Sequence, residues 1–143
     1  MSSRLERLAI EVVVMFVALS ALGGGVGLLG GGLAFPPEWL AGTPFTSYTV
    51  PGVILGLAVG GSALAAFVLM LLRHPWGIPV AAAAGAIEVG WIVGELILVG
   101  TRGNVMLALQ VLYFGAGAIV AVLAVHLLLG SDPRSVSFEM PQQ

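Results

Sequence analysis

Hydrophobic residues occur in four long runs, separated by short segments that carry most of the polar residues. The runs extend over residues 8–29, 50–72, 77–99 and 105–129. A helix that crosses the hydrocarbon core of a bilayer needs about 20 mainly apolar residues. The strands of a membrane barrel are about half as long and alternate between apolar and polar residues. A helix also satisfies its backbone hydrogen bonds within the segment. The pattern therefore predicts an all-α polytopic membrane protein, an antiparallel four-helix transmembrane bundle that forms a single domain over residues 1–143.

The composition excludes several other classes of protein. Hydrophobic residues make up 59% of the 143 residues and charged residues only 8%, whereas a soluble domain has about 25% charged residues. The net charge of -2 and the scattered basic residues do not favour a nucleic-acid partner. The chain has no cysteine, which excludes disulfides and thiolate metal sites. The composition therefore predicts a protein that is surrounded by a lipid bilayer.

The positive charges lie mainly on one side of the predicted spans. Arg4, Arg7, Arg73 and Arg134 lie on one side and Arg102 on the other. Because cytoplasmic loops carry an excess of Lys and Arg, we expect a multi-pass protein of the inner (cytoplasmic) membrane with both termini in the cytoplasm. The first run is longer than the apolar region of a signal peptide, about 7–15 residues, so we expect an uncleaved anchor.

The connections between the spans differ in length. The short segments 73–76 and 101–104 predict that spans two and three are neighbours, and likewise spans three and four. The outer segment 30–49 is longer and contains Pro37, which suits the first turn of a short helix, and Trp39, which suits the headgroup boundary. We expect this segment to lie at the interface over the outer end of the bundle, and residues 130–143 to form a polar cytoplasmic tail.

Small residues recur at intervals of four within three of the spans. Lipid tails give helices no hydrophobic reason to associate, so small residues that allow close backbone approach hold such bundles together. We expect these rows to form helix–helix contacts, and the sequence leaves open whether the contacts lie within one chain or between chains. The rows are Gly23, Gly27 and Gly31; Gly52, Gly56 and Gly60; and Ala86, Gly90 and Gly94.

Two acidic residues lie within the third span. Glu88 is close to its middle and Glu95 is seven residues further, with Trp91 between them on the same helical face. Because a charge at the centre of a bilayer is costly, this face is expected to point into the bundle or into a wet cavity.

Other polar residues are expected at matching depths. Ser20 and Ser62 are predicted to lie level with Glu88, and Gln110 and Tyr113 nearer the level of Glu95. The sequence thus suggests a polar column of Glu88, Glu95, Gln110 and Tyr113, and Arg102 is placed to reach Glu95 from the outer loop. At the cytoplasmic boundary, a contact between Glu11 and His126 would join spans one and four.

Two interpretations of the acidic pair remain open. In the structural one, neutral Glu88 and Glu95 form interhelical hydrogen bonds worth about 0.6–2 kcal/mol each. In the functional one, they bind or relay a proton, a cation or the polar head of a lipophilic ligand. An enzyme is the least supported class, because no cluster has metal-site spacing and no serine lies in a G-x-S-x-G context. The sequence predicts no catalytic residue, metal site or cofactor.

Three short motifs carry a resemblance to a known family. They are the stretch G-T-P-F-T-S-Y-T-V-P-G at residues 42–52, the stretch H-P-W-G at residues 74–77, and G-W-I-V at residues 90–93. With these motifs the chain resembles an uncharacterised family of small four-span bacterial membrane proteins. The resemblance implies a four-span fold and a bacterial cytoplasmic membrane, and it brings no activity or ligand.

Two functional hypotheses follow from these observations. The leading one is a non-enzymatic integral membrane protein that acts by association, as a homo-oligomer or as an accessory subunit of a membrane complex. The glycine rows and the near absence of residues outside the spans motivate it. The alternative is a small transporter or a protein that binds a lipophilic small molecule through Glu88 and Glu95.

Overall fold

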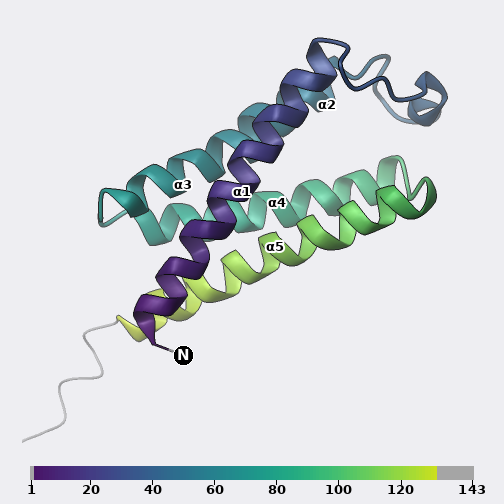
Figure 1. The fold of residues 1–143 in the computed structure, drawn as a ribbon. Coiled ribbons are helices and arrows are strands. Elements are labelled where there is room, and N and C mark those ends of the chain that lie inside the picture. The colour runs from purple at the N-terminus through teal and green to yellow at the C-terminus, as the bar shows by residue number, and fades with distance from the viewer. Residues whose placement is uncertain (1, 132–143) are drawn as a thin grey trace, which may run out of the picture.

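The computed structural model describes residues 2–131. The chain forms α1 (Ser3–Leu29), a 3-10 turn (Pro37–Leu40), α2 (Thr49–Val53), a π-helical segment (Ile54–Gly60), α3 (Gly61–Leu71), α4 (Gly77–Leu98) and α5 (Gly103–Gly130). Because α2, the π-helical segment and α3 are continuous, there are four long helices (Figure 1), and each is long and apolar enough to cross a membrane. The four predicted helical runs are confirmed, and residues 2–131 contain no strand.

The first helix begins earlier than the apolar run predicts. Ser2 has extended backbone angles, and its side chain accepts a hydrogen bond from the Leu5 amide at 3.4 Å. A serine in this position satisfies one of the free amides of the first turn, and Glu6 in that turn complements the helix dipole. The polar residues before residue 8 therefore extend α1 by more than one turn.

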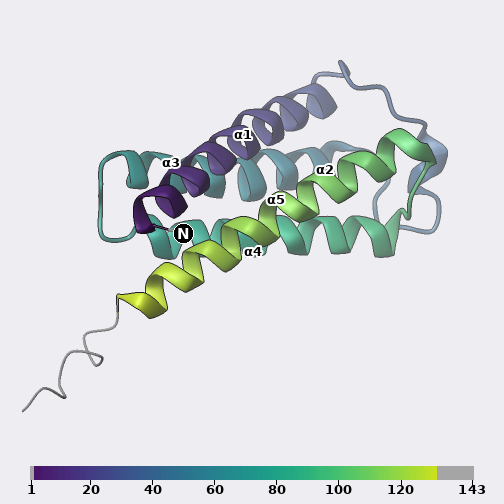
Figure 2. The same cartoon turned by 60° about the horizontal axis from the view of Figure 1, so that its bottom comes forward.

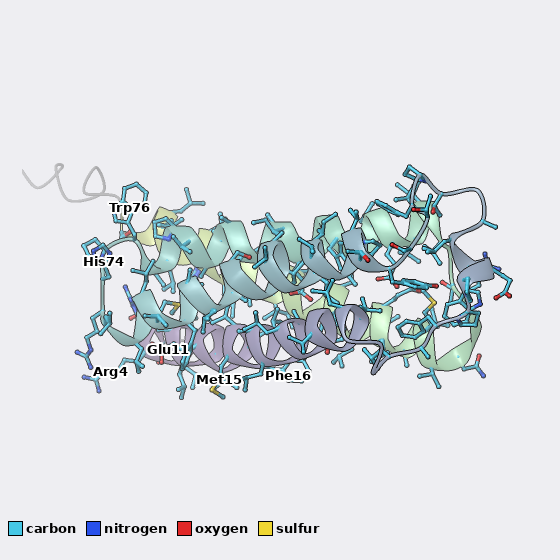
Figure 3. All side chains as sticks on the ribbon, turned by 90° about the horizontal axis from the view of Figure 1, so that it is seen from above. Arg4, Glu11, Met15, Phe16, His74 and Trp76 are labelled. Carbon is cyan, nitrogen blue, oxygen red and sulfur yellow. The ribbon has the colours of Figure 1, made fainter. Side chains whose placement is uncertain are left out.

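The ends of the helices fall into two groups. The start of α1, the α3–α4 turn and the end of α5 lie at one end of the molecule, and the α1–α2 connection and the α4–α5 turn lie at the other (Figures 1 and 2). Arg4 accordingly lies at the same end as His74 and Trp76 of the α3–α4 turn (Figure 3). Arg134 and the rest of the predicted tail after Ser131 lie outside the described residues.

The α3–α4 turn is tight. The His74 amide donates to the Leu69 carbonyl oxygen at 2.8 Å, and the Arg73 amide to that of Met70 at 2.9 Å. Arg73 has a φ of 52°, in the left-handed region that commonly ends a helix. This turn makes α3 and α4 neighbours, as the short connection predicts.

The core consists of two apolar clusters that follow one another along the molecule. In the cluster nearer the start of α1, Ile10 and Val14 pack with residues of α3, α4 and α5. In the second, Val17, Ala18 and Ala21 of α1 pack with Val59, Ala63 and Ala116. Alanine is frequent at these positions, so the helix backbones approach one another closely.

The contact of α1 with the second long helix depends on a glycine outside the predicted row. A Cβ atom at Gly25 would lie 2.7 Å from the Gly56 Cα atom and 2.9 Å from the Gly52 carbonyl oxygen. At Gly23 a Cβ atom has no neighbour within 4 Å, and at Gly27 it would meet Leu33 of the following connection. The row expected along Gly23, Gly27 and Gly31 is therefore not the contact between these helices.

The physical reason is the helical repeat. A turn holds about 3.6 residues, so positions spaced strictly by four drift around the helix, and a buried face alternates spacings of three and four. The buried residues of α1 follow that alternation through Val14, Val17, Ala18, Ala21 and Gly25. Gly31 lies beyond the end of α1 with a φ of 72°.

The glycine row of the second long helix does lie at the contact with α1. Cβ atoms at Gly52, Gly56 and Gly60 would meet Leu28, Gly25 and Leu22 at 3.1, 3.7 and 2.9 Å. The π-helical segment Ile54–Gly60 runs through this row. Its turns hold more residues than α-helical turns, which offsets the drift of a four-residue spacing and keeps the row facing α1.

In the third row, Ala86, Gly90 and Gly94, neither glycine faces another helix of residues 2–131. Cβ atoms at Gly90 and Gly94 would have no neighbour within 4 Å, and Ala86 is exposed. The close contact between α4 and α5 uses Gly85 instead, where a Cβ atom would lie 2.6 Å from the Gly117 carbonyl oxygen and 2.7 Å from the Ala121 nitrogen.

The connection between α1 and α2 is held by aromatic side chains. Phe35 stacks with Trp39 at a centroid distance of 5.6 Å and lies 5.9 Å from the Tyr48 ring. The Tyr48 hydroxyl donates to the Pro36 carbonyl oxygen at 2.9 Å. Burial and the nearby Glu38 carboxylate raise the pKa of Tyr48 against a lowering by Arg102, so the phenol keeps the proton that this hydrogen bond requires.

Candidate functional site

Glu88 lies at the centre of the helix core, eleven residues after Gly77 in the 22-residue helix α4. Only 3% of its surface is exposed. Its neighbours around a small cavity come from all four long helices: Val14 and Val17 of α1, Ala63 of α3, Ala84 and Gly85 of α4, and Gly117 and Val120 of α5. The cavity has a volume of about 10 Å³, about what one water molecule needs.

A glycine on α5 makes room for this side chain. A Cβ atom at Gly117 would lie 2.7 Å from Glu88 Cγ and 2.9 Å from Glu88 Cβ. Any larger residue at position 117 would therefore displace Glu88 or separate α4 from α5. The glutamate is thus built into the contact between these helices.

The Glu88 carboxyl group has no hydrogen-bond or ion-pair partner among residues 2–131, and its oxygen atoms keep a small accessible surface toward the cavity. The side chains around the cavity are those of valine, alanine and glycine, which offer neither a donor nor an acceptor. A buried polar group without a partner costs free energy, and a buried charge costs far more. Glu88 therefore does not form the interhelical hydrogen bond that the structural interpretation predicts.

Glu95 has a different environment. Its carboxyl oxygen Oε1 accepts a hydrogen bond at 3.4 Å from the Gln110 amide Nε2, which also donates to the Gly100 carbonyl oxygen at 3.2 Å. The Thr101 hydroxyl donates to the Gln110 Oε1 atom at 2.8 Å. Gln110 is 3% exposed. This network connects α4, the α4–α5 turn and α5, and it has the form expected for structural hydrogen bonding.

Tyr113 of the predicted polar column, and the two serines expected at the depth of Glu88, make other contacts. The Ser20 hydroxyl donates to the Phe16 carbonyl oxygen at 2.8 Å, and the Ser62 hydroxyl donates to that of Val59 at 3.1 Å. Both serines are therefore satisfied within their own helices. The Tyr113 ring stacks on Phe16 of α1, with 5.8 Å between the ring centroids.

Trp91 packs against the second apolar cluster. Glu88, Trp91 and Glu95 do share the inward face of α4, as their spacing predicts, since Glu88 is buried and the other two are half-buried. The structure brings Glu95 and Gln110 together, and it does not join them to Glu88 or Tyr113.

Two predicted polar contacts differ in the structure. The Arg102 side chain donates through Nε to the Val99 carbonyl oxygen at 3.2 Å and does not reach Glu95. His126 pairs with Glu6 rather than with Glu11, at 3.0 Å between Nδ1 and Oε2. Glu6 is buried, whereas 71% of the His126 side chain is exposed.

The signal for Glu6 was present in the sequence. It precedes Ile10 by four residues and Val14 by eight, so it lies on the buried face of α1. The residue falls outside the apolar run, and only the helix start at Ser3 places it on that face. Glu11 lies half-buried on α1 at the same end of the molecule (Figure 3).

The arrangement limits the chemistry at these positions. Within residues 2–131 no group of three or more His, Asp or Glu side chains is placed to hold a metal ion. Glu88 offers one carboxyl group to a water-sized, otherwise apolar cavity, and Glu95 offers one that is already hydrogen-bonded. Of these two carboxyl groups, that of Glu88 is therefore the one not engaged in a hydrogen bond within residues 2–131.

Comparison with known proteins adds no further constraint on this chemistry. No protein-family model, no curated protein and no solved structure matches the chain.

Proposed function

We propose that the protein is an integral membrane protein of the bacterial inner membrane that acts without catalysis, by association with a second membrane-spanning chain. In this proposal the four long helices insert as an antiparallel transmembrane bundle with both termini in the cytoplasm. The partner is a further copy of the chain or a larger complex of which the chain is an accessory subunit. The observation that carries the proposal is the outward face of α4.

This face carries a row of small residues at exposed or half-buried positions. Gly90 and Ala86 are exposed, and Cβ atoms at Gly90 and Gly94 would meet nothing within 4 Å. Many exposed positions on the other long helices carry large apolar residues such as Val26, Leu57 and Val111. Small residues along one helical face let a second helix approach closely in a membrane, as Gly85 does for α5 within the chain.

The volume at Glu88 favours association over the alternative of a lipophile-binding protein. A cavity of about 10 Å³ accommodates about one water molecule, whereas sites for drug-sized ligands measure about 300–1,000 Å³. Glu95 lies in a hydrogen-bonded network that joins α4 to α5. Association through the outward face of α4 is therefore better supported than binding of a lipophilic ligand at Glu88 and Glu95.

The experiment compares two glycines that have open space in the folded chain. We expect Gly90→Leu to weaken association by about five- to 150-fold, because overpacking costs about 1–3 kcal/mol and about 1.4 kcal/mol corresponds to a factor of ten. Gly115→Leu on α5, where a Cβ atom also has no neighbour within 4 Å, is the matched control and should associate like the wild type. Energy transfer between labelled copies in liposomes measures the fraction associated, and mass determination in mild detergent identifies the partner.

Two results would contradict this proposal. One is a wild-type chain that is monomeric in liposomes and in mild detergent, with no co-purifying membrane protein. The other is equal association of the Gly90→Leu and Gly115→Leu variants, which would place the contact on another face.

A further inference from the structure

We propose that Glu88 is a proton-binding site, in which the carboxyl group holds one proton while the helices are packed around it and releases the proton when α4 and α5 separate and several water molecules reach it. This inference goes beyond association and does not depend on it, since the site lies inside a single chain. It rests on the burial of Glu88, the absence of a partner for it among residues 2–131, and the size and lining of the cavity.

A metal cation does not fit this site. Hard cations such as Mg²⁺ and Ca²⁺ take about six to eight oxygen ligands, and among residues 2–131 only Glu88 brings side-chain oxygen atoms to the cavity. The backbone carbonyl groups of the lining residues belong to the interiors of helices, where they accept helical hydrogen bonds. A proton needs no further ligand, because it forms a covalent bond to one carboxyl oxygen.

Among residues 2–131, no charged side chain lies at the cavity to stabilise an ionised Glu88 carboxylate. The residues that line the cavity from α1, α3, α4 and α5 are apolar. The nearest titratable residues along these helices are Glu11, three residues before Val14; Tyr113, four before Gly117; His126, six after Val120; Glu95, seven after Glu88; and Arg73, ten after Ala63. Arg73 lies in the exposed α3–α4 turn, and the His126 ring pairs with Glu6 at 3.0 Å. An unpaired carboxylate in an apolar site is strongly disfavoured, so the closed packing requires the neutral acid.

Release of the proton is coupled to the packing of α4 against α5. The reaction is the dissociation of the carboxylic acid into a carboxylate, which stays on Glu88, and a proton, which passes to water. A carboxylate accepts several hydrogen bonds, while the cavity accommodates about one water molecule. Hydration of the anion therefore separates the helices near Gly85 and Gly117, whose backbones are in direct contact in the closed form.

Infrared spectroscopy of the whole chain in liposomes tests this directly. At neutral pH, where a solvated glutamate is ionised, we expect the wild type to show the carbonyl-stretch band of a protonated carboxylic acid. Glu88→Gln, which keeps the shape of the side chain, should lower the intensity of the band by the contribution of one carboxyl group, and the control Glu11→Gln should leave the intensity unchanged. A wild type without the band at neutral pH, or a band of equal intensity in the wild type and Glu88→Gln, would overturn the proposal.

The pH dependence of stability provides a second measurement, independent of the spectrum. Because the folded chain holds a proton that the unfolded chain releases, the ratio of folded to unfolded protein should fall as the pH rises, by up to tenfold per pH unit for one proton. Glu88→Gln should remove that slope, and Glu11→Gln should keep it. Equal slopes in wild type and Glu88→Gln would show that another group binds the proton.

Discussion

Replacing Gly25 by alanine is expected to lower the free energy of unfolding by about 1–3 kcal/mol, the usual cost of overpacking. The added Cβ atom would lie 2.7 Å from the Gly56 Cα atom, 2.9 Å from the Gly56 nitrogen and 2.9 Å from the Gly52 carbonyl oxygen. All three are backbone atoms, so no side chain can move aside. The whole of α1 has to move away from the second long helix, which also loosens the packing of the neighbouring residues.

The control for this substitution lies two residues earlier on the same helix. Gly23→Ala meets nothing within 4 Å, and alanine favours a helix over glycine by about 1 kcal/mol, so this variant should be as stable as the wild type or more stable. Helical circular dichroism during unfolding by a denaturing detergent in mixed micelles measures both. Equal loss of stability in the two variants would show that α1 does not contact the second long helix through Gly25.

Gly85→Ala should destabilise the α4–α5 contact to a similar extent, by about 1–3 kcal/mol. Its Cβ atom would lie 2.6 Å from the Gly117 carbonyl oxygen and 2.7 Å from the Ala121 nitrogen. The displacement needed to relieve these contacts separates α4 from α5 beside Glu88, so we also expect water to reach the cavity more easily in this variant. The same detergent titration measures the change in stability.

Gly115→Ala is the control on the opposite helix, since its Cβ atom would have no neighbour within 4 Å. We expect no loss of stability for it. A Gly85→Ala variant as stable as Gly115→Ala would contradict the close packing of α4 on α5 that makes room for Glu88.

The four long helices were predictable from the sequence because length and hydropathy suffice to identify them. The start of α1 was not, since its first turn is polar and is stabilised by Ser2 and Glu6 rather than by hydrophobic residues. The π-helical segment Ile54–Gly60 left no signal in hydropathy. Its position follows from the packing of the glycine row against Gly25 of α1, and the hydropathy of a single span does not report packing between two helices.

The candidate site was predictable in part. Depth along the spans correctly placed Gln110 level with Glu95, and the cost of a buried acid correctly placed Glu88 inside the core. Depth alone does not fix the direction in which a side chain points around its helix. Ser20 and Ser62 therefore lie at suitable levels yet bond to their own helices, and Tyr113 stacks on Phe16 of α1.

The measurement that tests the central claim most directly is the side of the membrane on which each end of the molecule lies. The chain has no cysteine, so single cysteines at Ser2, His74, Thr46 and Asn104, all exposed, report without background. With a membrane-impermeant thiol reagent outside intact bacterial cells, we expect labelling at positions 46 and 104, and labelling at 2 and 74 only after the inner membrane is opened. Labelling of all four positions from the same side would contradict four crossings, and with them the proposed location of Glu88 within the membrane.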